Sequence, residues 1–171
     1  LPRQRTALPQ RRKEPFHAGV RYENPKGAPA LTVSVRTAEQ VTDELLALHP
    51  ALIYLPADEG AAHPEVVERC RAPEVPAAAL LPRICTDREI QQLEDDLVAL
   101  RHLGVEQALA GTLGGVRRAM QLGFQVRGDY GLGVYNSQTL KELRRLGLVS
   151  ATASFELKLS QIRDLSKAIP L

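Results

Sequence analysis

The sequence lacks several of the residue types that most often define a site. Its 171 residues include no Trp, one Met, two Cys, three Phe and four Tyr. Two cysteines do not make a disulfide framework, and no apolar run approaches the roughly 18 residues of a membrane helix. The first residues are basic and proline-rich instead of apolar, unlike a signal peptide. We therefore expect a cytoplasmic protein with no membrane partner and an aliphatic core.

Several catalytic motifs are also absent. No Gly-x-Gly-x-x-Gly follows the first apolar run, which counts against a dinucleotide-binding fold. No His-x-x-x-His or Cys-x-x-Cys occurs, so we expect no metal site in this chain. No Gly-x-Ser-x-Gly marks a nucleophilic serine. Cys70 and Cys85 are interpreted as small core residues.

Charge divides the chain into two parts. Residues 1–30 hold seven of the 22 Lys and Arg, two of the 20 Asp and Glu, and five prolines. Residues 31–171 hold the remaining 15 basic and 18 acidic residues. We interpret residues 1–30 as a basic, proline-rich linker or arm. A solvated interdomain linker and an arm that touches nucleic acid both remain open.

Regular structure is predicted from residue 31 onward. Short runs that are apolar throughout, which is typical of strands buried on both faces, lie at 31–35, 52–56, 77–81, 106–110, 124–128, 151–155 and 168–171. Helical patterns separate them. Two begin with the capping boxes Thr37–Gln40 and Thr86–Glu89, and others are expected at 64–71, at 113–122, at 137–146 and around Leu159, Ile162 and Leu165.

This alternation predicts an α/β fold with a parallel sheet, and we favour an incomplete (βα)8 TIM-barrel-like domain over 31–171. It has about six βα units and a seventh strand. A full barrel has eight strands, so we expect a fragment of a longer protein, with the remainder of the parent chain as a partner. An open barrel leaves unpaired edges, which predicts a homodimer or a docked terminal segment.

In such a barrel, chemistry lies at the carboxyl ends of the strands and in the loops that follow them. Six residues at these positions are candidates for the site: Arg83, Asp129, Tyr130, Asn136, Ser154 and Glu156. Asp129 either acts in catalysis or orders its loop. Asn136 either contacts substrate or only caps the next helix. Arg83 either clamps an anionic substrate or pairs with a carboxylate.

Three segments resemble the collagenase-like peptidase family, U-thirty-two. They are LPRI (81–84), GDYGLGVYNSQTLKELRRLGL (128–148) and TASFELKLSQIRDL (152–165). The resemblance spans roughly residues 31–171 and is most specific in its last part. Asp129, Tyr130, Asn136, Ser137, Ser154 and Glu156 fall on matching motif positions. The arm resembles the connector of longer members, which carry a second copy of this barrel region.

The resemblance implies proteolysis of a peptide substrate. We take Asp129 and Glu156 as candidate catalytic residues, and Arg83, Tyr130, Asn136 and Ser154 as candidate substrate contacts. Other members are similar to oxygen-independent hydroxylation factors that act on RNA or a small metabolite. Some of these use prephenate and carry a four-iron, four-sulfur cluster on four cysteines.

Neither cysteine of this chain matches those cluster ligands, so we expect no cofactor here and a possible iron–sulfur cluster in the full-length parent. Two positions depart from the family pattern: Gly133 replaces the usual Asn, and Phe155 replaces the usual Pro. They leave a third alternative open, a non-catalytic duplicated scaffold.

Overall fold

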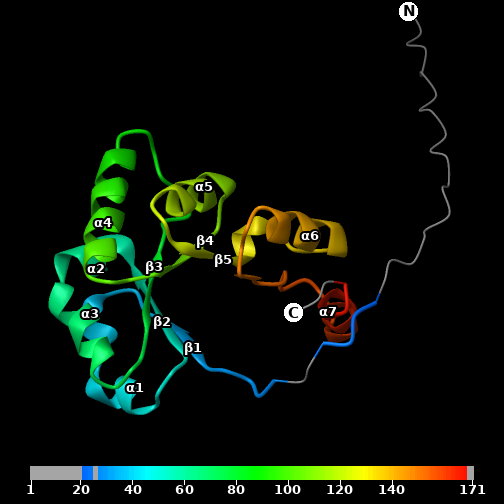
Figure 1. Ribbon diagram of the computed structural model, residues 1–171, viewed down its shortest axis with the longest axis horizontal. Coiled ribbons are helices and arrows are strands. Elements are labelled where there is room, and N and C mark those ends of the chain that lie inside the picture. Colours follow the sequence, from blue (N-terminus) through cyan, green and yellow to red (C-terminus); the bar gives the residue numbers. More distant parts are fainter. Residues whose placement is uncertain (1–20, 25–26, 169–171) are drawn as a thin grey trace, which may run out of the picture.

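The computed structural model describes residues 21–24 and 27–168. Within them, six strands run parallel and lie side by side in chain order: β1 (Thr32–Ser34), β2 (Leu52–Pro56), β3 (Ala77–Leu80), β4 (Gln107–Ala110), β5 (Gln125–Gly128) and β6 (Ser150–Ala151). This sequential order is that of a barrel, whereas a doubly wound sheet reverses its strand order. The predicted fold, an incomplete TIM-barrel-like α/β domain, is confirmed (Figure 1).

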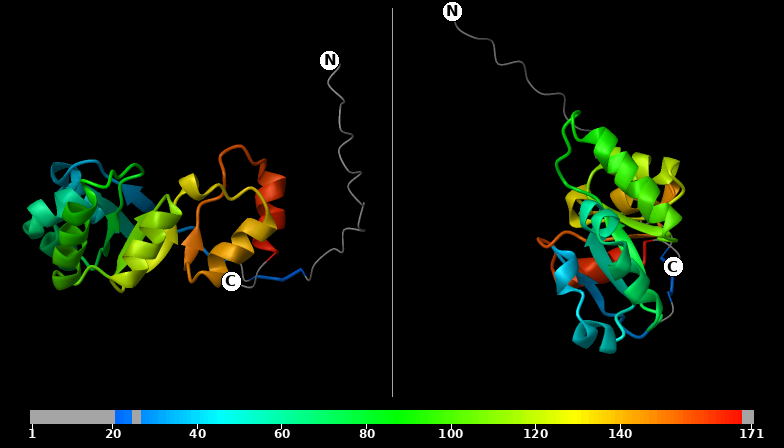
Figure 2. Two further views of the ribbon diagram at one scale, coloured as in Figure 1. Left: turned by 90° about the horizontal axis from the view of Figure 1, so that it is seen from above. Right: turned by 90° about the vertical axis from the view of Figure 1, so that its left-hand side faces the viewer.

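Helices connect the strands and cover the convex face of the curled sheet (Figure 2). They are α1 (Asp43–Ala47), α2 (Ala57–Ala62), α3 (Pro64–Arg71), α4 (Ile90–His102), α5 (Leu113–Gln121), α6 (Ser137–Arg145) and α7 (Leu159–Ser166), with 3-10 turns η1 (Ala38–Gln40) and η2 (Tyr130–Leu132). None of the helices in the described part of the chain is long and apolar enough to span a bilayer.

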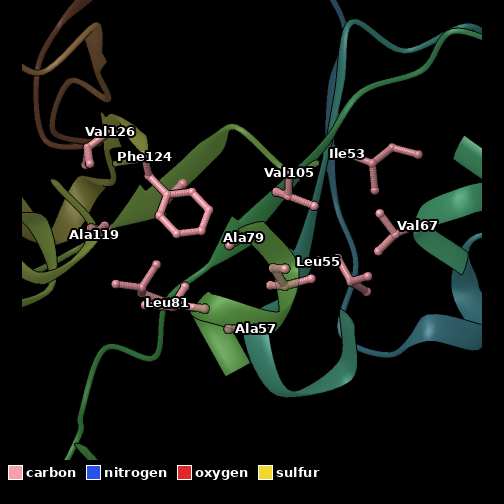
Figure 3. Packing of buried hydrophobic residues seen from close by; sticks show 14 of the residues in the cluster. Ile53, Leu55, Ala57, Val67, Ala79, Leu81, Val105, Ala119, Phe124 and Val126 are labelled. Atoms are coloured by element: carbon pink, nitrogen blue, oxygen red, sulfur yellow. The ribbon is translucent and has the colours of Figure 1, made fainter. Parts of the chain in front are cut away.

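The core lies between the sheet and these helices. Every second strand residue faces the helices, and Ile53, Leu55, Ala79 and Val126 are buried there in one cluster that also includes Phe124 (Figure 3). Because the alternate strand residues point to the concave side, one face of each strand makes this core. The core is aliphatic, as the scarcity of aromatic residues predicts.

The concave face mixes polar and apolar residues, and the expectation of strands buried on both faces holds for it only in part, because Leu52, Ala78 and Leu109 are buried there. Tyr54, Gln107 and Arg127 are only half-buried there, and Ser150 is exposed. Arg127 donates from Nε to Gln107 Oε1 at 2.7 Å and from Nη1 to Ser150 Oγ at 3.1 Å. This side chain therefore ties β4, β5 and β6 together from inside the curl.

Several predicted elements are shorter than expected, and two differ most. The helix expected after Thr37 is divided into η1 and α1, because Thr42 is extended and its hydroxyl accepts from Leu45 N at 3.3 Å as a new helix cap. The strand expected at 151–155 is reduced to Ser150–Ala151, followed by a single bridge between Val134 and Ala153. Beyond β6, Thr152 N still donates to Gly128 O at 2.8 Å and Ser154 N to Val134 O at 3.0 Å, so pairing with the preceding segment continues as single hydrogen bonds.

The arm and the seventh strand fall largely on residues 1–20, 25–26 and 169–171, which lie outside the described residues. The described part of the arm lies against α7. Tyr22 N donates to Lys167 O at 2.9 Å, and Arg21 lies 3.9 Å from Asp164. From its position beside α7, the arm leads to β1 (Figure 1).

Candidate functional site

A cleft of about 1070 Å³ opens at the carboxyl ends of the strands, on the concave side. Residues from the ends of all six strands, or from the loops after them, line it. The polar and charged lining includes Arg36, Tyr54, Asp58, Arg83, Asp129 and Tyr130. This is the edge at which (βα) barrels carry their active sites.

Tyr130 joins two other loops at the mouth of this cleft. The Arg83 guanidinium carbon lies 4.1 Å from the Tyr130 ring centroid, at cation–π distance. The Phe155 ring, from the loop after β6, has its centroid 4.9 Å from that of Tyr130. The loops after β3, β5 and β6 therefore meet at one aromatic side chain.

Asp129 follows β5 directly and caps η2. Its Oδ1 accepts from Tyr130 N at 2.8 Å. Burial raises the pKa of the Asp129 carboxyl above its ordinary value, and the nearby Arg83 charge offsets only part of that rise. Within the described residues, Arg83 and Asp129 form no ion pair, so both side chains keep polar atoms for a ligand.

Tyr54 also lines the cleft, although it was not among the six residues predicted from the sequence. Burial raises the pKa of its hydroxyl, the Arg127 charge lowers it, and the Asp129 charge raises it further. Its hydroxyl is therefore a proton donor at neutral pH. The sequence could have indicated Tyr54, because it lies between Ile53 and Leu55 in β2 and its side chain therefore points to the opposite face of the sheet.

Glycine allows the close packing that assembles this site. A Cβ on Gly131 would lie 2.5 Å from the backbone oxygen of Gly111, which directly follows β4. A Cβ on Gly111 would lie 3.6 Å from Asp129 Oδ2 and 3.7 Å from Arg83 Cγ. Gly131, in the 128–137 motif, therefore allows the backbone of η2 to contact the backbone that follows β4.

Gly133, in the same motif, has a left-handed φ of 63°. Glycine and asparagine are the residues that most readily adopt this conformation. Glycine at this position, where the pattern that the sequence resembles has Asn, is therefore compatible with the same backbone path. Phe155, at the other departure from the pattern, is 77% exposed and contacts Tyr130.

The other predicted site residues lie outside the lining of the cleft. Asn136 caps α6, and its Oδ1 accepts from Gln138 N and Thr139 N, both at 3.0 Å. Ser154 is buried, and its hydroxyl accepts from Glu156 N at 3.3 Å. Glu156 is exposed. The structure thus brings Arg83, Asp129 and Tyr130 together in the lining of the cleft, which does not include these three residues.

Acidic side chains form the wall of the cleft next to α2 and α4. Asp58 lies in the first turn of α2. Glu89 accepts from Thr86 N and Thr86 Oγ1, both at 2.8 Å, and these hydrogen bonds lower the pKa of its carboxyl. Asp96 accepts from Gln92 at 2.8 Å. Among the described residues that line the cleft, Arg36 and Arg83 carry the positive charge, and Arg127 lies on the same concave face next to Tyr54.

The cysteines do not fit an iron–sulfur cluster. Cys70 belongs to α3 and is buried near the amino-terminal edge of β3, where burial raises the pKa of its thiol. Cys85 lines the cleft at the opposite, carboxyl-terminal edge. The described residues contain no group of three or more His, Cys, Asp or Glu side chains that could hold a metal ion. A cluster that needs several cysteines together cannot be built from these two.

Comparisons with known proteins support the fold and go no further. No model of a known protein family matches the chain, and no curated protein matches it. Among solved structures, one described as "Native KDPGal structure" is similar with a TM-score of 0.58 and 12% sequence identity, over 86% of this chain and 71% of that chain. At this identity the likeness shows a shared fold alone, that of a (βα) barrel region.

Proposed function

We propose that this chain is a barrel region of a collagenase-like peptidase of the U-thirty-two type, and that its cleft binds a peptide. The convergence of Arg83, Asp129 and Tyr130 at the mouth of the cleft carries this proposal. They come from two of the three segments that resemble the family. They also lie where a barrel presents its chemistry. A cytoplasmic location and an association with the rest of a longer chain belong to the same proposal.

In this function Asp129 transfers the proton. A carboxyl group with a raised pKa is a better general base near neutral pH than an ordinary carboxylate. Asp129 takes a proton from the attacking water and returns it to the leaving amine. The Tyr54 hydroxyl, protonated at neutral pH, donates a hydrogen bond to the oxygen of the attacked carbonyl. Arg83 holds an anionic group of the substrate.

Cleavage of fluorogenic peptides by the purified full-length parent tests this role. Asp129→Asn should lower kcat/KM by about 100-fold or more, the usual contribution of a general base. Glu156→Gln shows whether the second candidate carboxylate also acts. Asp87→Asn is the matched control, because Asp87 is exposed and outside the cleft lining. Activity that is unchanged in Asp129→Asn would exclude the proposal.

A non-catalytic scaffold is the second candidate, and one observation favours it. Asn136 and Ser154, which fall on motif positions of the family, both have structural roles outside the cleft lining. Asn136 caps α6, and the Ser154 hydroxyl accepts a hydrogen bond from Glu156 N. A duplicated copy could keep these residues for folding alone. In that case no substitution in the cleft would change the activity of the parent protein.

The hydroxylation alternative requires an iron–sulfur cluster, and Cys70 and Cys85 do not match the ligands of such a cluster. Iron and acid-labile sulfide in the anaerobically purified parent would test it, with about four irons expected for one such cluster.

A further inference from the structure

We propose that the mouth of the cleft recognises the carboxyl-terminal end of a peptide whose last side chain is apolar. This inference rests on the proposed function and names the substrate class. Two independent features carry it: an arginine that forms no hydrogen bond or ion pair with the described residues, and an exposed apolar surface beside it.

The cation is Arg83. Its guanidinium contacts the face of Tyr130 at 4.1 Å. Within the described part of the chain it takes part in no hydrogen bond or ion pair. A guanidinium that is placed over a ring keeps its N–H edge available, and that planar edge matches the two oxygens of a carboxylate. The terminal carboxylate of a peptide supplies this group.

The apolar surface lies next to this cation. Among the described large hydrophobic side chains, Ile84 at 85% and Phe155 at 77% are the two most exposed. Ile84 follows Arg83 in the chain and lines the cleft, and Phe155 contacts the same Tyr130 ring as Arg83. An apolar side chain adjacent to a bound carboxylate would cover these residues and remove their surface from water.

The charges of the cleft favour a short peptide over a nucleic acid. Asp58, Asp96 and Asp129 line it together with Arg36 and Arg83. A chain of phosphates would meet these carboxylates, whereas a peptide end brings one negative charge that Arg83 can take. The peptide direction follows: the carboxylate lies at Arg83, and the preceding residues extend along the cleft past Asp129.

Calorimetric titration of the full-length parent tests this with Ala-Ala-Ala-Phe, its carboxyl-terminal amide and Ala-Ala-Ala-Ser. We expect the free acid to bind about tenfold or more tightly than the amide, the range of one charged hydrogen bond. Arg83→Gln should abolish this preference, and Phe155→Ala should reduce the preference for Phe over Ser. Arg88→Gln and Leu146→Ala, which change an exposed arginine and an exposed leucine outside the cleft lining, should retain both preferences.

The outcomes separate this inference from the proposed function. Equal binding of acid and amide, with cleavage that depends on Asp129, would overturn the inference and leave the peptidase in place. Preference for the free acid without any cleavage would support the inference and overturn the peptidase. Binding of a ten-nucleotide single-stranded RNA, with no binding of either peptide, would overturn both.

Discussion

At the scale of single residues, Asp129 is held where burial favours the neutral form of its carboxyl group. The pKa of this carboxyl is raised from the ordinary 3.8, and the Arg83 charge lowers it only in part. The folded protein therefore binds this proton more tightly than the unfolded chain does. The stability that the proton contributes is fully present below the unfolded pKa and is lost as the pH rises through the higher folded pKa.

Replacement of Asp129 by Asn should remove this pH dependence. The amide oxygen of Asn can still accept from Tyr130 N, while the buried charge is absent. The free energy of unfolding of Asp129→Asn, relative to the unmodified protein, should therefore increase between pH 4 and pH 7. Urea denaturation at several pH values measures it, with Asp87→Asn as control. A difference that stays constant, or decreases with pH, would show that burial does not control this group.

The sequence could predict which residues meet, but not all of their contacts. Arg83, Asp129 and Tyr130 follow strands of a barrel, and the fold alone brings such positions to one edge. Ser154 and Glu156 follow β6 by the same rule, and their loop reaches the cleft through Thr152 and Phe155, yet these two residues themselves are not part of the lining. The contact of Phe155 with Tyr130 depends on that loop path, which no local pattern specifies.

At the scale of elements, η2 packs directly on the backbone after β4. Gly131 makes this possible, because any Cβ there would lie 2.5 Å from Gly111 O. Gly131→Ala should lower the free energy of unfolding by about 1–3 kcal/mol, as overpacking usually does. It should also weaken ligand binding in the cleft, since η2 carries Tyr130.

Gly114→Ala is the matched control for this substitution. Gly114 lies in α5, and a Cβ there would meet nothing within 4 Å. Alanine should therefore stabilise the protein by about 0.5–1 kcal/mol through its helix propensity. Thermal and urea denaturation of both variants measures the difference. Equal stability of the two would contradict the close contact between η2 and Gly111.

Element positions followed from local patterns more closely than element lengths did. β2 and α3 have the predicted bounds, because apolar runs and a first-turn proline mark them. The helix predicted after Thr37 fails because Thr42 offers a competing cap. Local hydrogen bonds of Ser, Thr and Asn side chains compete with helix extension, and the spacing of apolar residues gives no indication of these hydrogen bonds.

At the scale of the whole molecule, the rhythm of strands and helices was enough to predict an incomplete barrel. Parallel strands with short crossovers leave few topologies. The polarity of the concave face was not predicted, because runs such as 52–56 contain one polar residue among apolar ones. Tyr54, Gln107 and Arg127 each occupy such a position, and they place polar groups among apolar neighbours such as Leu80 and Leu109 on this face.

The described sheet has two edges, at β1 and β6, and we expect a second copy of the chain to cover the edge at β6. An apolar groove of about 560 Å³ lies beside β6, between α6 and α7, and Val149 in it is 54% exposed. An unpaired parallel edge next to apolar surface favours association.

Analytical ultracentrifugation should therefore show a concentration-dependent dimer. Val149→Lys should shift it to the monomer, because a dimer would bury the charge. Val98→Lys, which changes an exposed valine on α4, should leave the dimer intact. A monomer at every concentration of the unmodified protein, or equal effects of the two lysines, would show that β6 is not the interface.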